Sequence, residues 1–177
     1  MRLGDRDESD LGEETGLGAF VGRNPLARRA AEVSGSGRYN IHCAVGAFVS
    51  ARSAILTNAK KTNVYCSHTG MIACDGADCS GAAEYGVFVN GSSQIDAAGV
   101  TAVNCGRFGL SAARCATMRA TGAVATGSGT CDISVRHGGM MDVTGVRTTN
   151  GTPAVEDTNL ANFNTVYGQG ILFNENV

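Results

Sequence analysis

The feature that most constrains this chain is a repeat of 23 residues that extends over residues 40–154. Shifting the sequence by this length places small and apolar residues on small and apolar residues, while most residues between them change. Val87 and Ile95, for example, become Leu110 and Met118 one repeat later. Five units fit this period, at 40–62, 63–85, 86–108, 109–131 and 132–154. A period in this range is typical of an array of stacked supersecondary units.

Each unit contains three pairs of positions, apolar at all thirty positions except Thr148, and the two members of a pair are two residues apart. Alternate residues of a strand face opposite sides, so this spacing predicts three short strands per unit. The first pairs are Ile41/Cys43, Val64/Cys66, Val87/Val89, Leu110/Ala112 and Ile133/Val135. The second are Val49/Ala51, Ile72/Cys74, Ile95/Ala97, Met118/Ala120 and Met141/Val143, and the third are Ala54/Leu56, Ala77/Cys79, Val100/Ala102, Ala123/Ala125 and Val146/Thr148.

One such unit cannot bury its inward residues alone, but a stack of units shares one continuous core. Equivalent strands then lie parallel, and parallel crossovers are nearly always right-handed. The pattern therefore predicts an all-β fold, a right-handed parallel β-helix with three short strands per rung and five to six rungs. The turn residues agree, because Gly or Asn, which tolerate left-handed backbone, recur between the strands. These residues are Gly76, Gly99, Gly122 and Gly145, with Ser53 in the first unit, and then Asn58, Gly81, Asn104, Gly127 and Asn150.

The two ends are less regular than the middle. We expect residues 1–16 to form an acidic arm or linker, and 17–154 to form the β-helix. Within it, 17–39 is expected to be an irregular capping rung and 40–154 five regular rungs. Residues 155–177 are expected to form a C-terminal cap or trimer-contact segment, because an open β-stack needs protection against edge-to-edge growth.

Composition narrows the function classes. The net charge of -2 gives no basic field for nucleic acid. We also expect no membrane insertion and no signal peptide, because no apolar run is long enough and the first residues are charged. The seven cysteines contain no CxxC, so we expect reduced, buried thiols and no metal site. No motif indicates a cofactor.

The chain resembles the pectate-lyase-like β-helix superfamily, and within it the receptor-binding tailspikes and tail fibres of bacteriophages. The resemblance lies in the stretch "YGVFVNGSSQIDAAGVTAVNC" and in the ending "TVYGQGILFNENV". It implies a homotrimer in the virion tail, made in the host cytoplasm, that contacts other tail proteins through its N-terminus. It also implies that the protein binds a host surface polysaccharide. The resemblance carries no catalytic residues across.

His42, Tyr65 and Phe88 share one outward offset and should stack as an aromatic stripe on successive rungs. Flat aromatic rings can bind sugar or pack against a partner subunit. Plain cross-strand stacking is the third interpretation. The sequence leaves glycan contact, subunit contact and simple stabilisation open.

Four acidic residues are weaker candidates. Asp96 and Asp142 flank Arg119 on one outward offset, which is typical of a charge ladder, although two carboxylates on alternate rungs also resemble a glycosidase pair. Arg119 between them should hold both ionised. Asp75 and Asp78 are consistent with turn chemistry or, alternatively, with a calcium or hydrolase site.

The remaining histidines and basic residues give no clear indication of a functional site. His68 and His137 are too far apart for a shared metal, and we expect Arg107, Arg136, Arg147, Lys60 and Lys61 to be solvated loop charges. Three functions remain: a glycan-binding tail-fibre module, a polysaccharide hydrolase or lyase on the same fold, and a purely structural shaft. Short loops and the absence of tryptophan argue against the enzyme.

Overall fold

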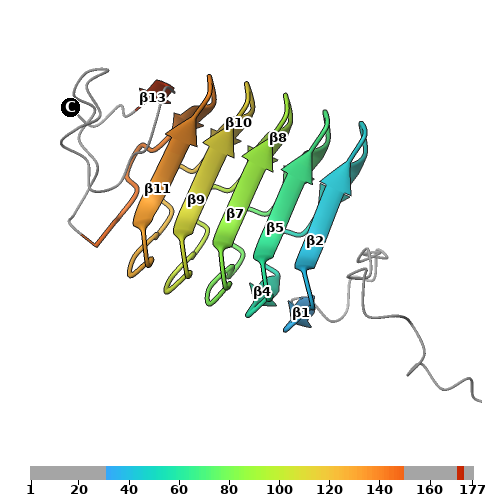
Figure 1. The fold of residues 1–177 in the computed structure, drawn as a ribbon, viewed down its shortest axis with the longest axis vertical. Coiled ribbons are helices and arrows are strands. Elements are labelled where there is room, and N and C mark those ends of the chain that lie inside the picture. Colours follow the sequence, from blue (N-terminus) through green and yellow to red (C-terminus); the bar gives the residue numbers. More distant parts are fainter. Residues whose placement is uncertain (1–30, 150–170, 174–177) are drawn as a thin grey trace, which may run out of the picture.

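The structure is a computed structural model that describes residues 31–149 and 171–173. These residues form a parallel β-solenoid of about five turns with no helix among them, which confirms the predicted fold class. The five-stranded sheet contains β2 (Tyr39–Ala44), β5 (Thr62–Ser67), β7 (Tyr85–Asn90), β9 (Phe108–Ala113) and β11 (Cys131–Arg136). Figure 1 shows these strands side by side in chain order.

The second sheet has six strands. It contains β3 (Phe48–Ser50), β6 (Met71–Ala73), β8 (Gln94–Asp96), β10 (Thr117–Arg119), β12 (Met140–Asp142) and β13 (Ile171–Phe173). Both sheets confirm the 23-residue register: Val64 pairs with Val87, and Ile72 pairs with Ile95. The repeat therefore sets the strand pairing directly.

The third side of the solenoid is thinner. Only β1 (Glu32–Ser34) and β4 (Ile55–Thr57) form a two-stranded sheet there. Beyond them, Ile55, Asp78, Thr101, Val124 and Arg147 are joined by single parallel bridges. The third side therefore keeps the predicted 23-residue register, but most of its rungs pair through a single residue instead of a full strand.

The repeated positions fill the interior, as the alternation predicts. All thirty of the paired positions are buried except Val49, which is half-buried in β3. The turn residues also have the expected backbone: Gly99 lies at φ 64° and Asn104 at φ 55°. Alternate inward and outward residues thus explain why the chain keeps some positions and changes others.

The ends fall only partly within the described residues. In the expected capping rung, Glu32 of β1 pairs with Ile55 of β4, while 17–30 lie outside the described residues. At the other end, Ile171 of β13 pairs with Met140 of β12 and extends the six-stranded sheet. The rest of 155–177, the acidic arm 1–16 and Asn150 also lie outside the described residues.

A buried polar corner at the start of the five-stranded sheet was not predicted. Asn40 donates from Nδ2 to Asn63 Oδ1 at 2.9 Å, and Asn63 donates onward to the Cys79 carbonyl at 2.7 Å. On the next two rungs after Asn63, the same position is occupied by Gly86 and then Gly109. Asp132 ends the row and accepts hydrogen bonds from the backbone. These amides satisfy carbonyls that the strands leave unpaired at the bend.

All seven cysteines are free thiols, and only Cys115 is exposed. Burial raises the pKa of Cys66 to about 12 and the pKa of Cys105 and Cys131 to about 11. The buried thiols therefore stay protonated near neutral pH and act as small apolar side chains.

No helix long and apolar enough to cross a bilayer occurs in the described ranges.

Candidate functional site

The predicted aromatic stripe forms on the outer face of the five-stranded sheet. The rings of His42 and Tyr65 stack with centroids 4.8 Å apart and planes 15° apart. Tyr65 and Phe88 follow at 5.3 Å and 18°. His42 also lies 3.1 Å from Ser67 Oγ through Nε2. Partial desolvation, with Arg38 and His68 nearby, lowers the pKa of His42 below 6.5, so this ring is neutral at pH 7.

The row is twice as long as the sequence analysis predicted. Tyr39 contacts His42 and Tyr65, with centroid distances of 5.2 and 5.0 Å. Tyr85 stacks on Phe88 at 4.7 Å and on Phe108 at 5.5 Å. The additional rings occupy a second outward offset, because 39, 85 and 108 are also separated by multiples of the repeat. That spacing could have revealed them in the sequence.

Stacking decides which part of each ring meets solvent. Tyr65 lies between His42 and Phe88, so both of its faces are covered. Phe88 is covered in the same way by Tyr65 and Tyr85. The row therefore presents ring edges, which carry the positive part of the aromatic quadrupole. Ring faces that could stack on a sugar are not offered along the middle of the row.

Arginines add positive charge to the same row. The Arg38 guanidinium lies over Tyr39 at 5.0 Å, and Arg107 lies over Phe108 at 5.3 Å. The Arg136 guanidinium also lies over Phe108, at 5.2 Å. The expectation of a solvated loop charge was wrong for Arg136, which ends β11 and is half-buried, whereas Arg107 is an exposed loop residue as expected. Both guanidinium groups gain dispersion and cation–π attraction on the ring surfaces.

These three arginines have no ion-pair partner within the described part of the chain. The ion pairs found there are Arg52–Asp75 and Arg119–Asp96. The outward positions of the five-stranded sheet carry no carboxylate. They are occupied by Tyr39, His42, Ala44, Thr62, Tyr65, Ser67, Tyr85, Phe88, Asn90, Phe108, Ser111, Ala113, Cys131, Ser134 and Arg136. Glu84 lies just before β7, at the offset of Arg38, Lys61 and Arg107, and is the carboxylate that borders this face. The outer face of this sheet, called here the arginine–aromatic face, therefore has more cationic than anionic side chains on and beside its strands, although the chain is slightly acidic.

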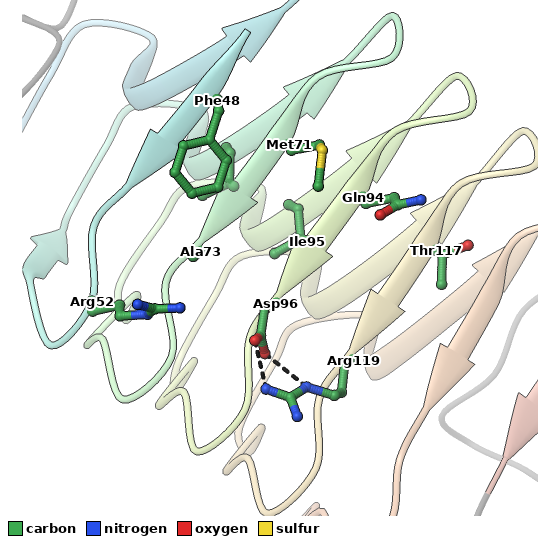
Figure 2. A pocket seen from close by; sticks show the side chains of 10 residues that line it. Phe48, Arg52, Met71, Ala73, Gln94, Ile95, Asp96, Thr117 and Arg119 are labelled. Carbon is green, nitrogen blue, oxygen red and sulfur yellow. Dashed lines mark hydrogen bonds and ion pairs between the residues drawn. The ribbon is translucent and has the colours of Figure 1, made fainter. Parts of the chain in front are cut away.

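A second candidate region lies on the outer face of the six-stranded sheet. A shallow groove of about 320 Å³ is lined there by residues of β3, β6, β8 and β10. Figure 2 shows Phe48, Met71, Gln94 and Thr117 in one row across the strands. Phe48 is 64% exposed and Met71 is 47% exposed. Neighbouring exposed apolar side chains form a patch, and such patches often mark contact sites.

Of the acidic candidates, Asp96 lines this groove, and Asp142 lies two rungs further along the same sheet. Arg119 holds Asp96 through Nη2–Oδ2 at 2.5 Å and Nε–Oδ1 at 3.0 Å (Figure 2). Asp142 instead accepts from Thr121 Oγ1 at 2.9 Å and from the Thr144 N–H at 2.9 Å. The expected charge ladder is thus one ion pair beside a carboxylate that is hydrogen-bonded to threonines.

Both carboxylates are held ionised. Burial alone would raise the pKa of Asp96, but the Arg119 and Ala98 hydrogen bonds outweigh it and the pKa lies below 3.8. Burial is likewise outweighed at Asp142 by the hydrogen bonds from Thr144 and Thr121, and its pKa is also lowered. A glycosidase needs one of its two carboxyl groups protonated as general acid. The surroundings of this pair give neither residue that property.

Asp75 and Asp78 have different hydrogen-bond partners. Asp75 accepts from Arg52 Nε at 2.7 Å on an exposed turn. Asp78 accepts from the Ser80 N–H at 3.1 Å, as a turn-forming aspartate does. In the described ranges, no three His, Cys, Asp or Glu side chains gather closely enough to hold a metal ion.

Comparison with protein-family models, curated proteins and solved structures gives no match to this chain.

Proposed function

We propose that the protein is a non-enzymatic binding module of the bacteriophage tail-fibre or tailspike kind, which contacts a surface polysaccharide and assembles as a homotrimer. The observation that carries the binding role is the arginine–aromatic face. It joins six stacked rings to three guanidinium groups that have no carboxylate partner in the described residues. A face that only stabilised the fold would gain from neutralising those charges on the same surface.

The regular shape of the solenoid supports the same role. Five parallel strands lie side by side across successive rungs, so their outward side chains share one sheet face (Figure 1). Such a surface can contact several units of an extended polymer at once, and weak contacts then add. The hydrolase or lyase alternative has less support, because the carboxylates that would carry it are held ionised by Arg119 and by threonine hydrogen bonds.

The homotrimer has its best support in the apolar surface around Phe48, Met71 and Val45. Val45 is 83% exposed on the turn before β3, three residues before the exposed Phe48. A cyclic trimer joins two different surfaces of each copy, so this patch could contact a neighbour while the arginine–aromatic face stays open for a ligand. Burying large apolar side chains supplies most of the free energy of such contacts.

Binding of fluorescently labelled protein to an array of bacterial surface polysaccharides tests the binding role. We expect the wild-type protein to bind at least one polysaccharide and Arg107→Glu to lose that binding. Arg147→Glu is the matched control, because Arg147 is an exposed arginine on the third side of the solenoid. A protein that binds no polysaccharide, or equal loss in both variants, would contradict the proposed role of this face.

A further inference from the structure

Where the aromatic stripe ends, two serines take its place. The offset of His42, Tyr65 and Phe88 continues as Ser111 on β9 and Ser134 on β11, and these serines pair in register. Both are fully buried, at 0% exposure, although they lie on the outer side of the sheet. Neither Oγ atom has a hydrogen-bond partner. Buried hydroxyl groups are nearly always satisfied, so this pair requires an explanation.

Arg136 lies over the serine pair. Its Cα is in register with Ala113 at the end of β9, whereas its guanidinium lies over the ring of Phe108, at the start of β9. The side chain must therefore run back along the sheet, past Ser134 and Ser111, to reach that ring. Its Nε is buried and also has no hydrogen-bond partner. Three unpartnered donors thus lie on the two neighbouring strands β9 and β11 of the arginine–aromatic face.

From this arrangement, we propose that Arg136, Ser111 and Ser134 form a carboxylate-binding subsite. A guanidinium group and two hydroxyl groups are suitable donors for the two oxygens of a carboxylate. The Arg136 guanidinium lies over the Phe108 ring and forms no ion pair with a described residue, so we infer that it can lift and admit the ligand between itself and the serines. No carboxylate occupies an outward position of this sheet and could fill the subsite instead.

A fourth atom favours a hydroxylated acid. Asn90 Oδ1 on β7 is buried and unpartnered, and Asn90 lies two strands from Arg136 in the same register row, with Ala113 between them. This acceptor suits a hydroxyl group adjoining the bound carboxylate, as in a uronic acid. The inference rests on the proposed function and adds the chemical class that this part of the face would recognise.

Isothermal titration calorimetry tests the subsite with four probes: hexagalacturonate, hexaglutamate, maltohexaose and inorganic phosphate. We expect hexagalacturonate to bind, and Arg136→Gln to weaken that binding about tenfold or more, since hydrogen bonds to a charged group are lost. Arg114→Gln is the matched control, because Arg114 is an exposed arginine just after β9 and contacts no ring in the described residues. Equal weakening in both variants, or equally tight binding of phosphate, would overturn the subsite.

A double Ser111→Ala, Ser134→Ala variant separates binding from folding. Removing buried hydroxyl groups that lack partners should leave the melting temperature unchanged or raise it, while hexagalacturonate binding weakens. A fall in melting temperature with unchanged binding would show a structural role and overturn the proposal.

The probes also separate the subsite from the proposed function. Binding of hexaglutamate but not hexagalacturonate supports the carboxylate subsite and assigns its ligand to a protein, against the polysaccharide role. Binding of maltohexaose that Arg136→Gln leaves unchanged, with neither acid bound, supports the polysaccharide role and overturns the subsite. Failure of both acids to bind overturns the subsite in every case.

Discussion

Two methionines of the six-stranded sheet allow a direct test of the inward and outward alternation. Met118 lies on β10, points into the core and has no exposed surface. It pairs with Ile95 on one side and Met141 on the other. Met71 lies on β6 of the same sheet but faces outward and is 47% exposed. The same substitution, Met→Ala, therefore removes the same atoms from two opposite environments.

The expected difference follows from burial. Met118→Ala removes the γ-methylene, the sulfur and the terminal methyl from the core, which costs about 2 kcal/mol in transfer free energy. The cavity left between Ile95 and Met141 raises the total to about 3 kcal/mol, within the range of roughly 2–5 kcal/mol for such changes. Met71→Ala should change the free energy of unfolding by less than about 1 kcal/mol.

Urea denaturation followed by circular dichroism measures both variants. In thermal melts, the Met118→Ala loss corresponds to a fall of roughly 6–12 °C for a chain of this size. If Met71→Ala and Met118→Ala destabilised the protein equally, the assignment of inward and outward positions from the repeat would be refuted.

Three further predictions follow from the core, the carboxylates and the glycines. Ellman's reagent should label one thiol of the native protein, Cys115, and all seven after denaturation; rapid labelling of several native thiols would contradict the buried assignment. The pKa of Asp96 is lower in the folded state than its ordinary 3.8, so its stabilising effect is present above that pH and is lost as the pH falls through the folded pKa. Acid titration of stability should therefore show a smaller decrease for Asp96→Asn than for the wild type, and identical curves would count against this. Gly86→Ala should fail to give folded protein, since a Cβ there would lie 2.7 Å from the Gly109 carbonyl oxygen, and a normal circular dichroism spectrum would show that the rungs can separate.

The repeat allowed most of the fold to be predicted from sequence. Inward positions such as Val64 and Val87 are constrained by a narrow core, and this leaves a regular apolar pattern that can be read directly. Other turns carry no such pattern. His68 lies at φ 51° and Arg114 at φ 53°, in left-handed backbone where glycine or asparagine would be expected. Because stacking on neighbouring rungs imposes this turn geometry, the left-handed backbone could not be predicted from the residue type.

The candidate sites were predictable only in part. His42, Tyr65 and Phe88 were found because identical offsets in a solenoid place side chains next to each other. The partners of Arg136 could not be found in the same way, because its long side chain runs back along the sheet to Phe108, at the opposite end of the neighbouring strand β9. The hydrogen bonds of Asp142 also depend on rotamers of Thr121 and Thr144 that no spacing rule fixes.

Native molar mass tests most directly whether this chain works as an assembled fibre-type module. Light scattering after size exclusion should give about three times the chain's 18.1 kDa for the wild type. Phe48→Ser should lower the mass toward one chain, whereas Ile55→Ser, which changes an exposed apolar residue on the third side, should not. A wild-type mass of 18.1 kDa would contradict the homotrimer and leave the exposed patch of Val45, Phe48 and Met71 without its proposed partner.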